Sequence, residues 1–314
     1  MNTWFKKSFL CTVCALTLMM PCAAFWQEHV QAFSEESLLT SSTGHVPVAQ
    51  TVEERTVAGV MIRFPLCASD PDGDTVTLKL IDQPRLGTAV LDNGSLIYTP
   101  AANRTGTDQF SYCAVDTLGN ESNPARISVK IERNPCAVTY ADMTHNPNHL
   151  AAVRLAQKGI FLGEKIGSSY FLHPNQPMTR SEFIAMTAAA AELEISQTTC
   201  TDFQDDSALS PWAKPYISAA ASAGLIQGYQ TASGSTEIRG ENPITISEAS
   251  VILSHLLGTV PADGTVSYQA VPAWAADATR QLAQADILPT ASDFNLSAPV
   301  TRELACTMLH KILP

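Results

Sequence analysis

Two arginines occupy the second position of a short motif in the C-terminal half of the chain, Thr179-Arg-Ser-Glu182 and Thr301-Arg-Glu303. A Thr followed three residues later by Glu forms a capping box, in which hydroxyl and carboxylate satisfy amide donors at a helix N-terminus. Only the Thr and the Glu are needed for this cap, so Arg180 and Arg302 are expected to point outward. A guanidinium beside a helix N-terminus attracts anions, which predicts an anion-binding site at each motif.

A second group of charged residues, Asp70-Pro-Asp-Gly-Asp74, contains three carboxylates within five residues. Clustered carboxylates suit calcium, so Asp70, Asp72 and Asp74 are candidate ligands, which Asp116 could join from another loop. The same residues also form a good turn. A turn is therefore the alternative to a calcium site, and the sequence implies no other cofactor.

Five of the eight cysteines lie beyond the N-terminal segment, and they form no CxxC pair. Zinc binding is therefore not expected. Cys67 and Cys113 fall on predicted strands and are candidates for a disulfide. Cys136 and Cys200 occupy similar places before two repeats and are a second candidate pair. Cys306 is expected to be a buried apolar residue in a helix.

Composition and motifs exclude several classes of function. The formal net charge of −11 argues against nucleic-acid binding, which needs clustered Lys and Arg. The seven His residues are scattered, and none stands in a nucleophile or metal-ligand pattern. The glutamates of the repeated motif are explained as helix caps, so the chain is expected not to be an enzyme.

The N-terminus has the features of an export signal. Lys6 and Lys7 precede an apolar run from Phe9 to Met20, and small residues follow, so residues 1–24 are predicted to be a cleaved signal peptide. Lipidation at Cys22 and an uncleaved anchor are the alternatives. Residues 25–46 are predicted to be a flexible leader, and no later stretch is long and apolar enough to span a membrane.

Residues 47–132 are predicted to form an all-β sandwich. Thr75–Ile81, Ser95–Tyr98 and Gln109–Val115 alternate with period two and are separated by turn residues. The motifs Ala68–Asp74, Leu86–Val90, Ile97–Pro100 and Gly106–Tyr112, in this order, resemble the bacterial cadherin-like, immunoglobulin-type repeats.

The C-terminal region repeats with a period of about 60 residues. Its second copy is the clearest, with Asp202–Asp205, Pro211–Ala213, Ala223–Gly228 and Pro243–Glu248 in order. The first copy has Tyr140–Asp142, Lys158–Gly163 and Pro177–Glu182, and the third has Pro272–Ala275, Ala285–Leu288 and Pro299–Glu303. This order resembles the S-layer homology family, with predicted repeats at 137–196, 200–258 and 263–314.

Each copy predicts two helices. Trp212 is expected to open a helix whose buried face includes Ile217 and Ala220, and Gly224 is expected to end it. Thr245 and Glu248 predict a second capping box. Two helices cannot enclose a core alone, so three copies are expected to close around a common axis, forming an all-α pseudo-trimer.

The resemblance implies a function for the grooves between repeats. In this family they bind secondary cell-wall polysaccharide, commonly carrying acidic pyruvyl groups, which holds a secreted protein at the cell wall or S-layer. Arg180 and Arg302, beside Thr179, Glu182 and Thr301, would then take the anion. Trp212 and Trp274 would supply apolar walls, and Gly163 and Gly228 would let the sugar approach the backbone.

Simpler interpretations of these residues remain open: core packing for the Trp residues and a solvated surface charge for the Arg residues. The copies also depart from the family pattern. Ile246 replaces the Arg in the second copy, with Arg239 as a substitute, and Pro147 replaces the Trp in the first. Glu303 stands one position early in the third. At most two competent grooves are therefore expected.

The sandwich could serve as a spacer or display domain for this anchor. Two alternatives assign it more: an adhesin whose sandwich binds a protein or glycan partner, and a structural component of a surface lattice. No contact with nucleic acid, or with the membrane after signal cleavage, is expected.

Overall fold

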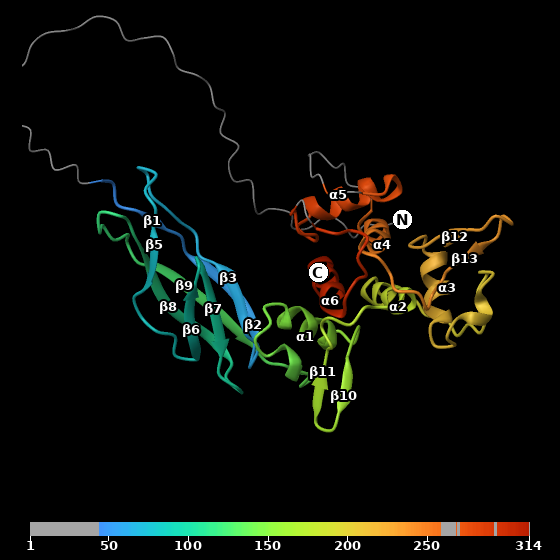
Figure 1. The fold of residues 1–314 in the computed structure, drawn as a ribbon. Coiled ribbons are helices and arrows are strands. Elements are labelled where there is room, and N and C mark those ends of the chain that lie inside the picture. Colours follow the sequence, from blue (N-terminus) through green and yellow to red (C-terminus); the bar gives the residue numbers. More distant parts are fainter. Residues whose placement is uncertain (1–43, 259–267, 269–270, 292–293, 314) are drawn as a thin grey trace, which may run out of the picture. The chain divides into compact units, whose positions relative to one another are not determined.

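The computed structural model describes residues 44–258, 268, 271–291 and 294–313. The predicted signal peptide at 1–24 and nearly all of the predicted leader at 25–46 lie outside the described residues. In the described part, an all-β region is followed by a helical region, which confirms the predicted fold class (Figure 1). None of the helices in this part is long and apolar enough to cross a membrane.

The N-terminal region is a sandwich of a four-stranded sheet, ordered β2-β9-β8-β5, and a three-stranded sheet, ordered β3-β7-β6. Along β9 the side chains alternate between buried and more exposed positions, so Ile127, Val129 and Ile131 face the core. The strands are β1 (Val48–Ala49), β2 (Val52–Val57), β3 (Ile62–Pro65), β4 (Ala68–Ser69), β5 (Thr77–Leu80), β6 (Gly87–Asp92), β7 (Ser95–Pro100), β8 (Gly106–Val115) and β9 (Ala125–Glu132).

A buried carboxylate explains one of the sequence motifs of the sandwich. Asp108 is 2% exposed and accepts hydrogen bonds from the amides of Arg85 (2.9 Å) and Leu86 (2.7 Å) and from the Tyr98 hydroxyl (2.8 Å). Buried polar groups are costly unless they are paired, and these three donors pair this one. Asp108 therefore ties the loop before β6 to β7 and β8.

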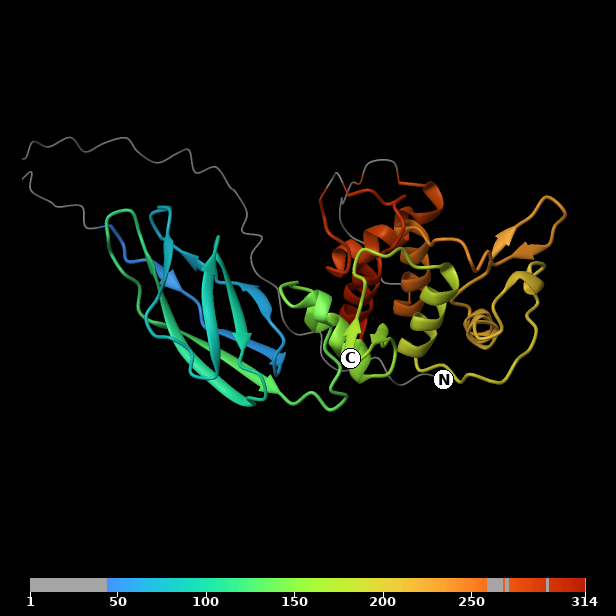
Figure 2. The same cartoon turned by 60° about the horizontal axis from the view of Figure 1, so that its bottom comes forward.

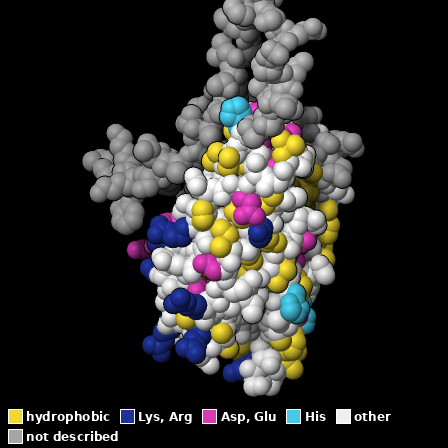
Figure 3. Space-filling model, turned by 90° about the vertical axis from the view of Figure 1, so that its left-hand side faces the viewer, with side chains coloured by type: hydrophobic (Ala, Val, Ile, Leu, Met, Phe, Trp, Pro, Cys, Tyr) yellow, Lys and Arg dark blue, Asp and Glu magenta, His cyan; other side chains and the backbone are white. Residues whose placement is uncertain are grey.

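Figure 3 shows one face of the molecule, the left-hand side of Figure 1, where the sandwich lies. Lys and Arg side chains gather toward the lower edge of this face, and acidic side chains lie among them. Hydrophobic side chains on its described part are scattered between polar ones. Single exposed apolar residues of this kind are ordinary for a protein surface.

The C-terminal region contains three copies of a unit with two α-helices, and in the first two copies a hairpin lies between the helices. Within each described copy, a short 3₁₀ turn precedes the first helix. The helices are α1 (His149–Gln157) and α2 (Arg180–Ala190), α3 (Lys214–Ser222) and α4 (Ile246–Leu257), and α5 (Ala276–Gln284) and α6 (Arg302–Ile312). The hairpins are β10 (Glu164–Ile166) with β11 (Ser169–Phe171) and β12 (Tyr229–Gln230) with β13 (Thr236–Glu237). The 3₁₀ turns are η1 (Ala141–Met143), η2 (Asp206–Ala208) and η3 (Ala273–Ala275).

A cyclic set of three backbone hydrogen bonds joins the copies. The amide of Met178 donates to the carbonyl of Val300 (2.9 Å), Val300 donates to Ile244 (2.8 Å), and Ile244 donates back to Met178 (3.1 Å). All three residues are fully buried. Each copy therefore contacts both others at one point, which is the closed arrangement that the repeats predict.

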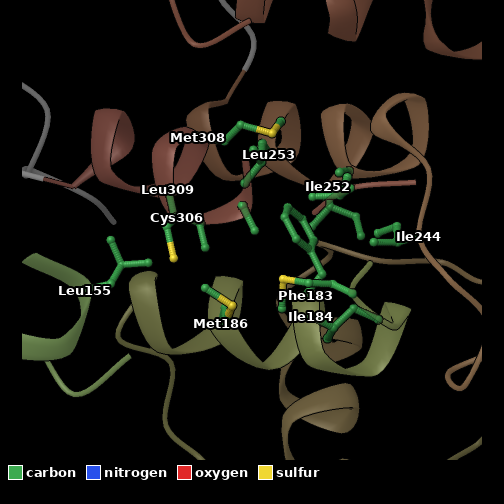
Figure 4. Packing of buried hydrophobic residues seen from close by; sticks show 14 of the residues in the cluster. Leu155, Phe183, Ile184, Met186, Ile244, Ile252, Leu253, Cys306, Met308 and Leu309 are labelled. Carbon is green, nitrogen blue, oxygen red and sulfur yellow. The ribbon is translucent and has the colours of Figure 1, made fainter. Parts of the chain in front are cut away.

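The helices follow the same cyclic order. The first helix of each copy packs against the second helix of the preceding copy: α1 on α6, α3 on α2 and α5 on α4. In Figure 2 the second helices α2, α4 and α6, coloured yellow-green, orange-brown and red, lie together at the centre of the helical region. Figure 4 shows their buried side chains converging, among them Phe183, Leu253 and Met308.

The helix ends agree with the sequence in most respects. Thr179 with Glu182, and Thr245 with Glu248, form complete capping boxes. Thr301 accepts only the amide of Leu304, because Glu303 is one position early and is bonded instead to the side-chain amide of Asn148 (2.6 Å).

The helix around Trp212 differs from its prediction at one end. Gly224 follows α3 with a φ of 73°, as expected of a helix-ending glycine. The helix itself begins at Lys214, and Trp212 lies in the turn before it. The predicted start of this helix at Trp212 is therefore wrong by two residues.

The predicted Cys67–Cys113 disulfide is wrong. All five cysteines of the described part are free thiols, Cys136 and Cys200 included. The Tyr112 hydroxyl donates to the Cys67 carbonyl (3.0 Å), which places Cys67 on the Tyr112 side of β8, whereas the adjacent Cys113 side chain points to the opposite face. Cys306 is buried as predicted, and burial raises the pKa of its thiol to about 12.

The structure does not bring Asp70, Asp72 and Asp74 together as a group of calcium ligands. Among the described residues, no group of three or more His, Cys, Asp or Glu side chains is placed to hold a metal ion. Asp72 binds the imidazole of His45 (2.6 Å), and Asp116 accepts amides of its own turn. Asp70 accepts the amide of Asp72 (2.8 Å) within the 70–74 segment, which agrees with the turn given as the alternative interpretation.

A buried histidine makes the first copy sensitive to acid. His149 is 3% exposed, and its Nε2 accepts the amide hydrogen of Tyr140 (3.1 Å), so the imidazole must be neutral. Burial lowers the pKa of His149 from 6.5 to about 4. The unfolded chain binds a proton here below about 6.5, while the folded chain does so only near 4.

The free energy of unfolding should therefore fall as the pH drops from 6.5 to 4, by up to roughly 3 kcal/mol from this group. Urea unfolding across this range measures the slope. His149→Gln, which can accept the same amide without titrating, should make this slope smaller. An unchanged slope in this variant would contradict the assignment.

Candidate functional site

The guanidinium of Arg180 lies against a tyrosine of the next copy. Arg180 is only 8% exposed, and its Cζ lies 4.9 Å from the centroid of the Tyr229 ring. Its Nε and Nη1 have no hydrogen-bond partner among the residues that the structure describes. The expectation that this side chain points outward into solvent is therefore wrong, because Tyr229 draws it into a cation–π contact.

Tyr229 also contacts a second cation. The Cζ of Arg239 lies 4.6 Å from the same ring centroid, and the Arg239 Nε donates to Glu237 (3.2 Å). The Tyr229 hydroxyl donates to Glu248, whose other oxygen accepts the Thr245 amide (2.8 Å). Burial, followed by the hydrogen bond to Glu248, raises the pKa of Tyr229 to about 12, so the phenol stays protonated.

A cleft of about 690 Å³ opens beside Arg180 and Tyr229. One side is formed by the loop after α3, another by α4, and Trp274 of the third copy contributes to the rim. Most of its wall is apolar, and the cationic group is the buried guanidinium. The lining residues are Arg180, Leu225, Ile226, Gln227, Gly228, Tyr229, Gln230, Glu248, Val251, Ile252, His255 and Trp274.

The two tryptophans are not core residues. Trp212 is 50% exposed and Trp274 is 62% exposed, which contradicts the core-packing interpretation. Trp274 lines the cleft of Arg180, whereas Trp212 is not part of its wall. The structure thus brings together Arg180, Gly228, Trp274 and the cap residue Glu248, and it places Trp212 elsewhere.

Gly163 and Gly228 are required by local packing. Both have left-handed backbone, with φ values of 66° and 76°. A Cβ on Gly163 would lie 2.5 Å from the Phe171 carbonyl oxygen, and one on Gly228 would lie 2.7 Å from the Phe203 ring. Phe203 belongs to the motif that begins the second copy, so Gly228 sets the loop that shapes the cleft.

Arg302 has a different environment from Arg180. Its Nη1 donates to the Leu172 carbonyl (3.3 Å), its Nη2 lies 3.8 Å from Glu182, and its Cζ lies 5.6 Å from the Phe161 ring. Its Nε is buried without a partner in the described part of the chain. Arg302 therefore occupies the equivalent groove of the first copy, with part of its donor capacity already used.

Among the described residues, the third groove has no equivalent guanidinium. Ile246, which replaces the Arg, is 3% exposed and packs in the core. The corresponding cleft of about 320 Å³ is lined by Glu303 and by Lys311, which pairs with Asp286 (3.0 Å). The motif of the second copy therefore supplies a buried apolar side chain, and no cation, at this position.

The helix N-termini contribute less than the sequence suggested. The amides of Arg180 and Ser181 donate to the carbonyls of Asn242 (2.8 Å) and Gly240 (2.9 Å), and the Glu182 amide donates to its cap. The first donors of α4 and α6 are used in the same way by neighbouring copies. An anion at these sites would be held by side chains instead of free backbone amides.

Sequence reasoning missed Tyr229 as a site residue and treated Arg239 only as a substitute for the arginine missing at Ile246. Tyr229 directly follows Gly228, and an aromatic residue after the glycine that shapes the cleft was a usable signal. Arg239 carries no such signal, because its approach to Tyr229 depends on the fold of the β12–β13 hairpin.

Comparisons with known proteins agree with this architecture. Residues 44–130 match the bacterial Ig domain family, and residues 202–245 match the S-layer homology domain family. The second match covers the second copy only, so the first and third copies rest on the cyclic arrangement described above. The chain therefore contains a bacterial Ig domain followed by an S-layer homology domain.

One curated relative is the "Surface-layer 125 kDa protein" of Lysinibacillus sphaericus, 34% identical over 112 residues. The match covers 36% of this chain and 9% of that protein. The S-layer homology domain and this relative indicate a cell-surface, cell-wall-associated location, and the domain implies a role in cell-wall anchoring.

Solved structures resemble only part of the chain. The endo-fucoidan hydrolase MfFcnA4 is 18% identical with a TM-score of 0.25, covering 30% of this chain and 14% of that one. The PKD domain of an M14-like peptidase from Thermoplasmatales archaeon SCGC AB-540-F20 is 20% identical with a TM-score of 0.21, covering 27% and 92%. Scores this low add nothing to the assignment of function.

Gly228→Ala should destabilise the cleft loop more than Gly234→Ala. Both glycines have left-handed backbone, so both variants lose about 1 kcal/mol from conformation. A Cβ at position 228 would also clash with the Phe203 ring, which adds roughly 1–3 kcal/mol to the loss of stability. Nothing lies within 4 Å of a Cβ at position 234. Thermal unfolding of the two variants measures the difference, and equal losses would contradict this packing.

Proposed function

We propose that the helical module anchors this protein non-covalently to the cell wall by binding an acidic secondary cell-wall polysaccharide in the cleft beside Arg180. The observation that carries the proposal is the buried guanidinium of Arg180. Two of its nitrogens lack a partner in the described residues, and the group borders a cleft of about 690 Å³. An acidic sugar, such as a pyruvylated one, would supply the missing partner.

The energetics favour an anion at this position. Removing a charged group from water is costly, and the Tyr229 ring compensates only part of that cost. A carboxylate meeting the guanidinium would form charge-assisted hydrogen bonds, each contributing about 1.5–3 kcal/mol. The site is thus prepared for a negative group before the ligand arrives.

The rest of the cleft suits a sugar ring. Its wall is mainly apolar and includes Leu225, Val251 and Ile252, and Trp274 offers an exposed flat surface. Apolar C–H faces of a sugar can lie against such surfaces while its hydroxyl groups reach the polar rim. His255 also lines the cleft, with its Nδ1 3.0 Å from the Leu225 carbonyl oxygen.

The three grooves would contribute unequally. Arg180 has unused donors and an open cleft, Arg302 is partly engaged by Glu182 and Leu172, and the groove of the third copy lacks the arginine. Multivalent attachment depends on the number of sites that bind at the same time. The anchor would therefore depend mainly on one groove, with the sandwich acting as a spacer or displayed domain.

Replacing Arg180 by Ala should weaken co-sedimentation with isolated wall sacculi by roughly ten- to a hundredfold, the loss of at least one charge-assisted hydrogen bond. Arg302→Ala should cause a smaller loss because part of its donor capacity is already used. The double variant should no longer sediment.

Arg126→Ala removes the same charge from an exposed site on the sandwich and serves as the control. Sedimentation of the Arg180→Ala variant at the level of the Arg126→Ala variant would refute the site.

A further inference from the structure

We infer that Arg239 is a second ligand-binding cation, and that it and Arg180 together hold the acidic group of the sugar. This inference rests on the proposed function and refines it. Beside the large cleft lies a small chamber of about 110 Å³, lined by Arg180, Tyr229, Arg239, Asn242, Pro243, Thr245 and Glu248. It has room for a carboxylate group, while the ring of the same sugar would occupy the large cleft.

The two chambers share the same dividing residues. Arg180, Tyr229 and Glu248 line both, while Trp274 lines only the large one and Arg239 only the small one. Both guanidinium carbons lie within 5 Å of the same ring centroid, at 4.9 Å and 4.6 Å. Because both arginines also line the small chamber, an anion in it can approach both cations, which favours a carboxylate over a neutral substituent.

The backbone holds Arg239 in place. The Asp205 carboxylate accepts the amides of Ile238 (2.9 Å) and Arg239 (2.7 Å), and Arg239 has a φ of 55°, an uncommon value for a residue with a side chain. The Nε of Arg239 is bound to Glu237, and its terminal nitrogens make no hydrogen bond to any residue in the described ranges. Those nitrogens are the donors left for a ligand.

The neighbouring acidic residue does not oppose an anion as strongly as its charge suggests. Glu248 accepts hydrogen bonds from the Tyr229 hydroxyl and the Thr245 amide. Both of its oxygens are thereby engaged, and Arg180 and Arg239 both contact the Tyr229 ring. The local balance favours binding of a negative group.

The corresponding position differs in the other two copies. Asp142 holds the amides of Leu172 (3.0 Å) and His173 (2.7 Å) as Asp205 holds those of Ile238 and Arg239. Counting back from the proline before each motif, Arg239 corresponds to His173 in the first copy and to Asn295 in the third. The groove of the second copy therefore has two arginines, that of the first has one arginine and a histidine, and that of the third has neither.

The test uses the full chain and two probes: wall polymer isolated from the native cell wall, and the same polymer with its carboxyl groups chemically reduced to alcohols. Arg239→Gln should lower affinity for the native polymer about tenfold, the loss of one charge-assisted hydrogen bond. It should leave the weaker binding of the reduced polymer unchanged. Arg126→Gln is the matched control, and thermal unfolding checks that each variant is folded.

The outcomes separate the two proposals. If Arg180→Ala loses binding while Arg239→Gln binds the native polymer like the unmodified chain, the role of Arg239 is refuted and the proposed function stands. If Arg239→Gln lost the same affinity for both polymers, that role would also be refuted, because the lost contact would not be one with the carboxyl group. If neither variant loses binding, the proposed function fails as well.

A gain of binding provides a second test. His173→Arg should place a second cation in the groove of Arg302, and in an Arg180→Ala background it should restore part of the affinity for the native polymer. No restoration in a folded variant would count against a two-arginine chamber as the basis of selectivity.

Discussion

The helical module depends on three backbone hydrogen bonds that link Met178, Val300 and Ile244 in a closed cycle. Each bond joins two copies that are far apart in the sequence, and each lies at a fully buried position. A buried amide or carbonyl without a partner is costly. Separating one copy would leave backbone groups of the other two copies without their hydrogen-bond partners. This constraint turns three weak two-helix units into one core, with α2, α4 and α6 at its centre (Figure 4).

The same cycle creates the candidate site. Because the copies interlock at the start of their second helices, the first residue of α2 lies beside the hairpin of the second copy. Arg180 thereby meets Tyr229, and Trp274 of the third copy reaches the same cleft. No single copy contains this constellation. The groove forms only when the three copies close around their common axis. The residues that neighbouring copies contribute to each groove determine whether it contains a cation for an anion.

Local signals in the sequence predicted local features well. The Thr–Glu spacing gave both capping boxes, Gly224 gave a helix end, and alternation gave the main strands. Features that depend on the far side of the fold were not predictable in this way. Arg180 is expected in solvent from the sequence because its partner Tyr229 belongs to another copy. The spacing of Cys67 and Cys113 suggests a disulfide, but it does not reveal that Cys67 lies on the Tyr112 face of β8 and the Cys113 side chain on the other. The free amides expected at the helix N-termini were likewise taken by neighbouring copies.

The central claim is that the Arg180 guanidinium meets an acidic sugar in its cleft. Nuclear magnetic resonance of the full chain, with labelled arginine and tryptophan side chains, tests it most directly during titration with isolated wall polymer. We predict that the Arg180 Nε–H and Trp274 indole signals shift together and saturate, while Arg126 stays unchanged. Polymer binding that leaves the Arg180 signal in place would contradict the account.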